Sequence, residues 1–176
     1  MATSTPTPPD PGPPPATAAR HEKLDTVAAQ VAAIDELIGL AHHSIRVFDV
    51  DLSWMGWNES MRAEMIVAFL RASRNARLDI VVHDTGWIER SCPRLTRLLT
   101  YYGHLITIRR TGDEAKHAMD PLVIVDDQHY LHRLHVTQPR AVLGIAQPEE
   151  AKPLIERFEA IWSTAEPGVS GTVLGL

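Results

Sequence analysis

Residues 44–83 read SIRVFDVDLSWMGWNESMRAEMIVAFLRASRNARLDIVVH, and they contain two apolar runs on either side of a helical segment. The runs are SIRVFDV (44–50) and LDIVVH (78–83), which are rich in β-branched residues, as buried strands are. Residues 58–75 lie between them and begin at Asn58, a favourable N-cap for a helix. Two strands joined by a crossover helix form the unit of a parallel sheet. This stretch therefore predicts an α/β fold.

The same alternation continues in both directions along the chain. Residues 23–41 place apolar side chains at helical spacing, which predicts an amphipathic helix before the first strand. Residues 87–102 predict a third helix that restarts at Pro93, because proline suits the first turn of a helix. LITIRR (105–110) predicts the third strand.

The rhythm changes after residue 120. PLVIVDD (121–127), HYLHRLH (129–135) and RAVLGIA (140–146) are strand-like runs with only short breaks between them. Short breaks favour antiparallel neighbours, because a parallel crossover needs a longer connection. Residues 148–164 then predict a closing helix. We therefore expect a three-layer α/β/α sandwich around a mixed sheet.

Composition excludes several classes of protein. Hydrophobic residues make up 44% and charged residues 22% of the 176 residues, which is typical of globular domains and not of fibrous or wholly disordered chains. No apolar run approaches the roughly 20 residues of a membrane span, and the N-terminus lacks the pattern of a secretory signal. The single cysteine, Cys92, excludes a disulfide framework and indicates a cytoplasmic protein.

Proline and charge divide the chain further. Seven of the 13 prolines lie in residues 6–15, so we expect a disordered Pro-rich tail over residues 1–20 and one folded domain over residues 21–176. The net charge of −5 does not support a nucleic-acid or phosphate ligand. The chain has no P-loop and no GxGxxG, GxSxG or CxxC motif, so we expect no cofactor.

Asp49 and Asp51 follow the first strand of the predicted sheet, at the edge where open α/β sheets bind ligands. Aspartates two residues apart point the same way on an extended chain and can hold a divalent ion or a basic group. The more common role of such a pair is to cap a loop or to pair with arginines. Both are candidate binding residues.

Three histidines, His129, His132 and His135, lie in the run HYLHRLH. On a strand His129 and His135 share one face and His132 points to the other, so the three cannot hold one metal ion and we expect no metal site. Arg133 lies between His129 and His135 on their face. Arg133 and His135 are therefore candidates for binding an anion.

His117 precedes an apolar strand that ends in two aspartates. A histidine in this place can act as nucleophile or general base if a carboxylate orients its far nitrogen, and Asp120 and Asp126 are the candidate carboxylates. Lys116 is a candidate phosphate ligand beside it. A histidine at the surface without such a role is the more common outcome.

The order of elements and several stretches of sequence resemble the phospholipase D superfamily over residues 30–166. IDELIGLAHHSIRVFDVDL and MIVAFLRASRNARLDIVVHD are similar to the segments around that family's first two strands, and PEEAKPLIERFEAIWSTA to its closing helix. KHAMDPLVIVDDQHYLHR takes the place of the signature HxK(x)4D(x)6GSxxN. The chain also resembles a small bacterial family of uncharacterised phospholipase D-like domains, sometimes found beside N-acetyltransferase domains.

The resemblance implies a single half-domain whose signature is degenerate. In active members the histidine accepts the phosphoryl group and the lysine two residues later stabilises its charge. Here Met119 takes the place of that lysine, the position seven residues after His117 holds Ile124, and Asp126 lies nine residues after it. The GSxxN segment is absent, and AVLGIAQ is its nearest counterpart.

These observations favour a noncatalytic binding or assembly module. One alternative is a phosphodiesterase or nuclease with a rewired site, in which His117 is the nucleophile and Arg133 or Lys116 holds the phosphate. Another is an accessory domain of a partner acetyltransferase. Active members of the resembling family use two half-domains, so the resemblance also implies a homodimer in the bacterial cytoplasm.

Overall fold

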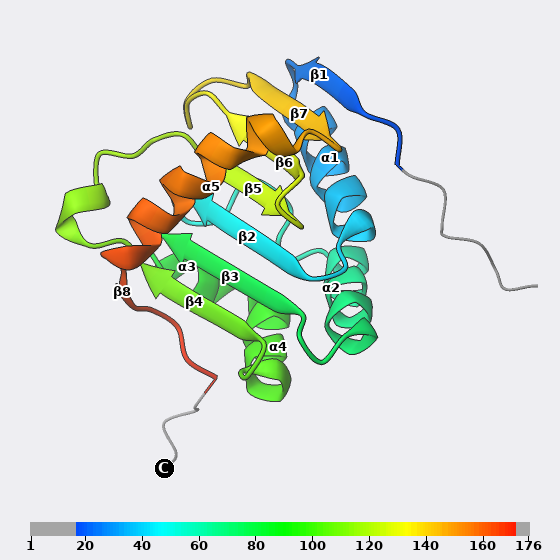
Figure 1. Cartoon of the computed structure of the whole chain (residues 1–176). Coiled ribbons are helices and arrows are strands. Elements are labelled where there is room, and N and C mark those ends of the chain that lie inside the picture. The colour runs from blue at the N-terminus through cyan, green and yellow to red at the C-terminus, as the bar shows by residue number, and fades with distance from the viewer. Residues whose placement is uncertain (1–16, 172–176) are drawn as a thin grey trace, which may run out of the picture.

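The computed structural model describes residues 17–171, and in this part of the chain one mixed eight-stranded sheet lies between helices on both faces (Figure 1). The strands lie in the order β1-β7-β6-β5-β2-β3-β4-β8. In chain order the elements are β1 (Arg20–Leu24), α1 (Val27–Leu40), β2 (Ser44–Asp49), α2 (Ser60–Ala72), β3 (Arg77–Val82), α3 (Gly86–Ser91), α4 (Pro93–Tyr102), β4 (Ile106–Arg110), the short 3-10 turn η1 (Asp113–Ala115), β5 (Leu122–Val125), β6 (His129–Arg133), β7 (Ala141–Ile145), α5 (Pro148–Ser163) and β8 (Glu166–Pro167).

The sheet has a parallel half and an antiparallel half. β2, β3 and β4 are parallel, with Val47 opposite Ile80 and Ile80 opposite Ile108. β5 is antiparallel to β2, and β5, β6 and β7 form an antiparallel meander. Both the three parallel strands and the antiparallel extension are as predicted from the lengths of their connections.

The helices form the two outer layers. α5 crosses one face of the sheet, and α1, α2 and α4 cover the other (Figure 1). On the second face, Ile34 of α1 belongs to a core cluster with Val47 and Leu131 from the sheet. On the first face, Phe158 of α5 belongs to a separate cluster with Phe48 and Tyr130. The three-layer α/β/α sandwich predicted from the sequence is confirmed.

Local signals set the starts of α1, α4 and α5. The Thr26 hydroxyl caps α1 by accepting a hydrogen bond from the Ala29 N–H at 3.2 Å. Pro93 occupies the first turn of α4, and Pro148 that of α5, where their missing N–H groups cost no helical hydrogen bond. The restart at Pro93 therefore divides the predicted third helix into α3 and α4.

Two predicted helices differ at their starts. The helix expected from an Asn58 N-cap begins at Ser60 after Glu59, and the Asn58 side chain instead accepts from the Arg94 N–H at the start of α4. The helix expected over residues 23–41 begins at Val27, and Lys23 and Leu24 instead belong to β1, which pairs antiparallel with β7. The Thr26 cap fixes this boundary, and the edge of β7 supplies the strand's hydrogen bonds. The expected tail lies outside the described residues except for 17–20, of which Arg20 begins β1.

Among residues 17–171, no helix combines the length and the apolar character that a membrane crossing requires.

Candidate functional site

The topology brings most of the predicted site residues to one end of the sheet. Asp49 ends β2 and Arg133 ends β6, and both strands run antiparallel to β5. Asp120 precedes β5, so it lies at this same end, which we call the carboxyl end of the parallel strands. Asp126 follows β5 and therefore lies at the opposite end of the sheet.

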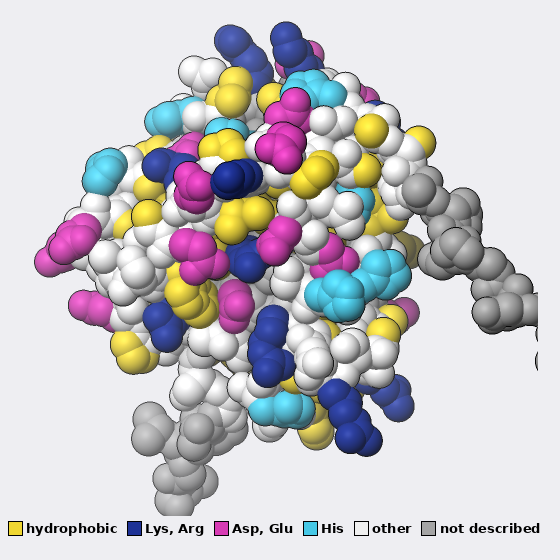
Figure 2. All heavy atoms as spheres, in the orientation of Figure 1, with side chains coloured by type: hydrophobic (Ala, Val, Ile, Leu, Met, Phe, Trp, Pro, Cys, Tyr) yellow, Lys and Arg dark blue, Asp and Glu magenta, His cyan; other side chains and the backbone are white. Residues whose placement is uncertain are grey.

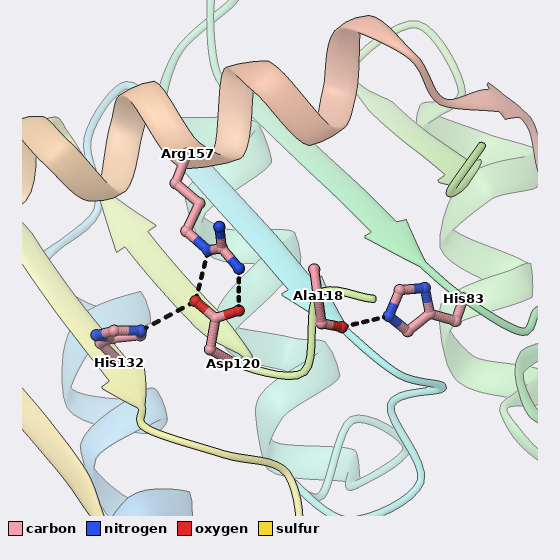
Figure 3. Close-up of polar contacts among 5 residues, drawn as sticks. All are labelled: His83, Ala118, Asp120, His132 and Arg157. Atoms are coloured by element: carbon pink, nitrogen blue, oxygen red, sulfur yellow. Dashed lines mark hydrogen bonds and ion pairs between the residues drawn. The ribbon is translucent and has the colours of Figure 1, made fainter. Parts of the chain in front are cut away.

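Three side chains meet at the carboxyl end on the α5 face, and we call them the Asp120 cluster: Asp120, His132 and Arg157 (Figure 3). The Arg157 guanidinium binds both oxygens of the Asp120 carboxylate. It donates from Nε to Oδ2 at 2.5 Å and from Nη2 to Oδ1. The Nε2 atom of His132 lies 3.3 Å from Asp120 Oδ2. Asp120 therefore joins α5 to β6 through the loop before β5.

The electrostatics of the Asp120 cluster keep the carboxylate charged. Burial by itself raises the pKa of Asp120, but the hydrogen bonds and charges of His132 and Arg157 outweigh it and lower the pKa to about 2. A carboxylate with this pKa is a poor general acid or base near neutral pH. Its chemical role in this arrangement is to hold the side chains of Arg157 and His132.

His83 fixes the loop that carries His117. It follows β3, and its Nε2 lies 2.6 Å from the carbonyl oxygen of Ala118, so this nitrogen donates (Figure 3). Its Nδ1 then accepts from the Thr111 hydroxyl at 2.7 Å. The ring also packs edge-on against Phe48. Both nitrogens of His83 are thus occupied by the protein itself.

His117 and Lys116 lie on the surface of that loop. Lys116 forms an ion pair with Asp113 at the exposed η1 turn. His117 is exposed and lines a shallow hollow together with Arg157 and Ile161 of α5. Within residues 17–171 His117 forms no hydrogen bond or ion pair, so neither Asp120 nor Asp126 orients its ring.

Asp49 and Arg133 lie on the other face of the sheet. Both line a small cavity with Trp57. Arg133 is buried and donates from Nη2 to the carbonyl oxygens of Val136 at 2.8 Å and Gln138 at 3.4 Å, while its Nε has no partner in the described residues. Burial raises the pKa of Asp49 to about 6, although its hydrogen bond from the Val50 N–H and the charge of Arg133 oppose the rise.

The other histidines of the run HYLHRLH do not join a site. His129 is buried, and its Nδ1 accepts from the Ala146 N–H at 2.9 Å. His135 lies exposed beyond the end of β6, with its Nδ1 2.9 Å from the Thr137 hydroxyl. An exposed stripe of His129, Arg133 and His135 is therefore not formed.

Two of the predicted aspartates cap loops. Asp51 accepts from the Ser53 N–H and hydroxyl at 2.9 and 2.7 Å. Asp126 accepts from three consecutive backbone N–H groups, those of His42, His43 and Ser44, at 2.7 to 2.8 Å. Asp126 thus ties the α1–β2 connection to β5, far from His117.

Sequence reasoning missed Arg157 and His83. His83 directly follows β3, at the edge where α/β sheets bind ligands, so its position was a usable signal. Arg157 lies 37 residues from Asp120 on an amphipathic helix, and nothing local to it indicates the pairing. In the part of the chain that is described, no group of three His, Cys, Asp or Glu side chains is placed to hold a metal ion.

Known proteins share this fold. Residues 26–170 match the family described as "Domain of unknown function (DUF7931)", and no curated protein matches the sequence. Nuc from Salmonella typhimurium, a phospholipase D family member, superposes with a TM-score of 0.61 at 18% identity over 87% of this chain and 99% of Nuc. NucT from Helicobacter pylori gives 0.56 at 12% identity over 86% of this chain and 100% of NucT.

TrmBL2, an archaeal chromatin protein described as showing a novel mode of DNA binding, gives a TM-score of 0.64 at 13% identity. The match covers 89% of this chain but only 56% of TrmBL2. At these identities the likenesses show the fold alone, and that fold is the phospholipase D-like half-domain expected from the sequence.

Proposed function

We infer the function from the premise that this chain belongs to the family described as "Domain of unknown function (DUF7931)", and we propose that it is a noncatalytic binding or assembly module. One observation carries the proposal: Asp120, a candidate carboxylate for orienting His117, is bound on both oxygens by Arg157 and leaves His117 without that partner. A histidine nucleophile needs its far nitrogen held by such a partner.

The positions for stabilising phosphate charge support the same proposal. Met119 stands where the resembling family has its lysine, and a thioether donates no hydrogen bond. Lys116 forms an ion pair with Asp113. Arg133 is buried on the face of the sheet opposite to that of Arg157, beside which His117 lies. No cation of the predicted set therefore faces the nitrogen atoms of His117. Losing a charge clamp on a transferring phosphoryl group costs about 3 kcal/mol or more of transition-state stabilisation.

The test is an assay for phosphodiester hydrolysis. We expect the purified chain to hydrolyse a chromogenic phosphodiester and single-stranded DNA no faster than its His117→Ala variant, with or without EDTA. Turnover well above that of the variant contradicts the proposal and makes His117 the nucleophile of a rewired phosphodiesterase.

A specific observation favours a different histidine for the enzymatic alternative. His132, not His117, is the ring that Asp120 contacts (Figure 3). Arg157 binds the same carboxylate through Nε and Nη2, but its side chain is 40% exposed and its Nη1 forms no hydrogen bond within residues 17–171, so this nitrogen can donate to an anionic substrate. The second candidate function is therefore a phosphodiesterase with His132 as its nucleophile. Turnover that survives His117→Ala but vanishes in His132→Ala identifies this alternative.

We also propose that the module assembles as a homodimer through the carboxyl end of the sheet. Leu134 is 52% exposed and Trp54 71% exposed, and both follow strands that end there. Met119 is also exposed, and its carbonyl accepts from the N–H of Val136, two residues after Leu134. Exposed apolar side chains at one end of a molecule are typical of an interaction surface.

Light scattering tests the dimer. The chain should have about twice its 19.5 kDa mass at micromolar concentration, and Leu134→Glu should return it to the monomer mass. Tyr101→Glu, an equally drastic change at an exposed side chain of α4, should leave the dimer intact. A monomer at every concentration contradicts this assembly.

We also propose that the chain acts in the bacterial cytoplasm and that its partner is a protein such as an acetyltransferase. The free Cys92 is buried and burial raises the pKa of its thiol, which suits a reducing bacterial cytoplasm. An accessory role beside an acetyltransferase predicts that such an enzyme co-purifies with the chain. TrmBL2 gives a precedent for this fold in a protein described as binding DNA, whereas the net charge of −5 disfavours that ligand here.

A further inference from the structure

The charge of the chain is unevenly distributed. Residues 65–110 contain eight arginines and three acidic residues, although the whole chain has a net charge of −5. The face that carries α5 presents acidic and basic side chains side by side (Figure 2). The helices of residues 65–110 lie on the opposite face of the sheet (Figure 1). Positive charge is therefore concentrated in the segment of the chain that contains α3 and α4.

Most of these arginines have no acidic partner. Arg110 pairs with Glu166, and Arg109 stacks on Trp162. Within residues 17–171 the other six form no ion pair; they are Arg71, Arg74, Arg77, Arg90, Arg94 and Arg97. All six are exposed. Unneutralised surface arginines raise the local potential and attract an acidic partner.

Two of the six border an apolar groove between α2 and α4. The groove is lined by Ala63 and Val67 of α2 and by Leu98 of α4, with Arg94 and Arg97 on its α4 side. Its lining also contains Ser60 and Glu64, whose side chains bond to each other at 3.4 Å. The floor of the groove is thus apolar and its α4 rim is cationic.

The dimensions of the groove suit a helix. α2 and α4 lead into the parallel strands β3 and β4, so the two helices run in the same direction and contact each other along the sheet. The lining residues of α2 extend over two helical turns, or about 10 Å at 1.5 Å per residue. An amphipathic helix binds such a groove through apolar residues at i, i+3, i+4 and i+7.

We propose that the groove between α2 and α4 binds an amphipathic helix of a partner protein, whose apolar stripe contacts Ala63, Val67 and Leu98 and whose acidic flank pairs with Arg94 and Arg97. This inference rests on the proposed function as a binding module and names the chemistry of its partner. The apolar floor favours a protein helix over nucleic acid, because a phosphate backbone offers nothing to Val67 or Leu98.

The probe is a fluorescein-labelled helical peptide of about 15 residues, with leucines along one face and glutamates only on the flank that would lie against Arg94 and Arg97. Fluorescence anisotropy should show binding to the full chain that weakens as salt is raised. A second peptide, with lysines in place of the glutamates, should not bind. The proposal is overturned if the first peptide does not bind at a protein concentration of about 100 μM, because even a weak specific site should show binding there.

Matched variants locate the site. Arg97→Glu should weaken binding of the first peptide by about tenfold, since the change reverses a charge on the groove. Arg74→Glu is the control, because Arg74 is also exposed and forms no ion pair within residues 17–171 but lies in the turn between α2 and β3. Equal losses in the two variants show that only net charge matters, and they overturn the assignment to the groove.

Two further outcomes would overturn the proposed occupant and identify another. If a DNA duplex binds more tightly than the acidic peptide, and Arg97→Glu abolishes that binding, the groove is a nucleic-acid site. A change in mass caused by Arg97→Glu without peptide makes a second copy of this chain the occupant. Phosphodiester turnover measured on the same samples contradicts only the proposed noncatalytic function, so failure of one inference is distinguishable from failure of the other.

Discussion

Asp120 makes the stability of the fold sensitive to acid. Its pKa of about 2 in the folded chain lies below the ordinary value of 3.8, so its carboxylate stabilises the fold above about pH 4. That stabilisation is lost as the pH falls through about 2. Because Arg157 is partly exposed and solvent screens the pair, we expect a contribution of about 1 kcal/mol.

Asp120→Asn should therefore lower the free energy of unfolding at pH 7 and reduce its decline between pH 4 and pH 2. Urea denaturation across this range measures the difference. Asp113→Asn is the matched control, because the ion pair of Asp113 with Lys116 is exposed and such pairs contribute little. A profile for Asp120→Asn that parallels the wild type contradicts the assigned role of the Asp120 cluster.

Asp49 has the opposite pH dependence. Burial raises its pKa to about 6, so the folded chain favours the protonated carboxyl. The resulting stabilisation is complete below about pH 4 and is lost as the pH rises through about 6. Asp49→Asn keeps an oxygen that can accept from the Val50 N–H but cannot ionise.

The change in melting temperature between pH 5 and pH 7 tests this assignment. The wild type should lose more stability over this interval than Asp49→Asn does. Comparing the two chains removes the contribution of His129, whose pKa is lowered by burial and which both chains retain. The same change in both chains would mean that Asp49 does not titrate in this interval.

At the scale of elements, the β6–β7 pair depends on a glycine. Gly144 lies opposite Tyr130, and a Cβ at this position would lie 2.9 Å from the Tyr130 Cδ1 and closer still to two other ring atoms. Gly144→Ala should therefore destabilise the chain by about 1–3 kcal/mol through overpacking. Combining it with Tyr130→Ala should cost less than the sum of the two single changes, because the second makes room for the first.

Gly39→Ala is the control for this prediction. Gly39 lies in the last turn of α1, where a new Cβ would lie 3.7 Å from the Met65 Cε, an ordinary contact. Alanine should stabilise the helix by up to about 1 kcal/mol there. Thermal unfolding of the four variants measures both effects, and a stable Gly144→Ala chain would show that the Tyr130 ring moves freely.

The elements differ in how far the sequence predicts them. β2 and β3 are buried on both faces, so their apolar runs stand out from the flanking helices. β1 reads RHEKL and buries only Leu24, and it is a strand because β7 lies beside it, more than 110 residues later in the sequence. Alternation along β6 correctly separates His132 from His129, as period-2 geometry requires.

The candidate site was less predictable than the strands, because it depends on contacts between residues far apart in the sequence, as β1 does. The side chains of Asp120 and Arg157 meet through the packing of α5 on the sheet, and no spacing in the sequence encodes that contact. Asp126 is of a residue type that can orient a catalytic histidine, yet its partners are backbone N–H groups of a loop about 80 residues earlier. Residue type identifies candidates, whereas tertiary contacts decide which candidates are already occupied.

At the scale of the whole molecule, β1 completes one edge of the sheet. Its pairing covers β7 from Ala141 to Ile145, and Arg20 forms an ion pair with Glu36 of α1 at 2.6 Å. An uncovered β7 would offer unpaired backbone groups to other chains, which is a route to aggregation. The N-terminal boundary of the domain therefore matters for stability as well as for solubility.

Two truncations test where the domain begins. A chain that starts at residue 17 should melt within about 1 °C of the whole chain, because residues 6–15 supply prolines and almost no apolar surface. A chain that starts at residue 25 loses β1 and the buried Leu24, which contributes about 2 kcal/mol, and should melt about 5 °C lower. It should also show light scattering that grows with concentration, as the edge of β7 becomes available to other copies. Equal melting temperatures for the two truncated chains would show that β1 adds nothing to the fold, and a loss already at residue 17 would place the boundary earlier than we propose.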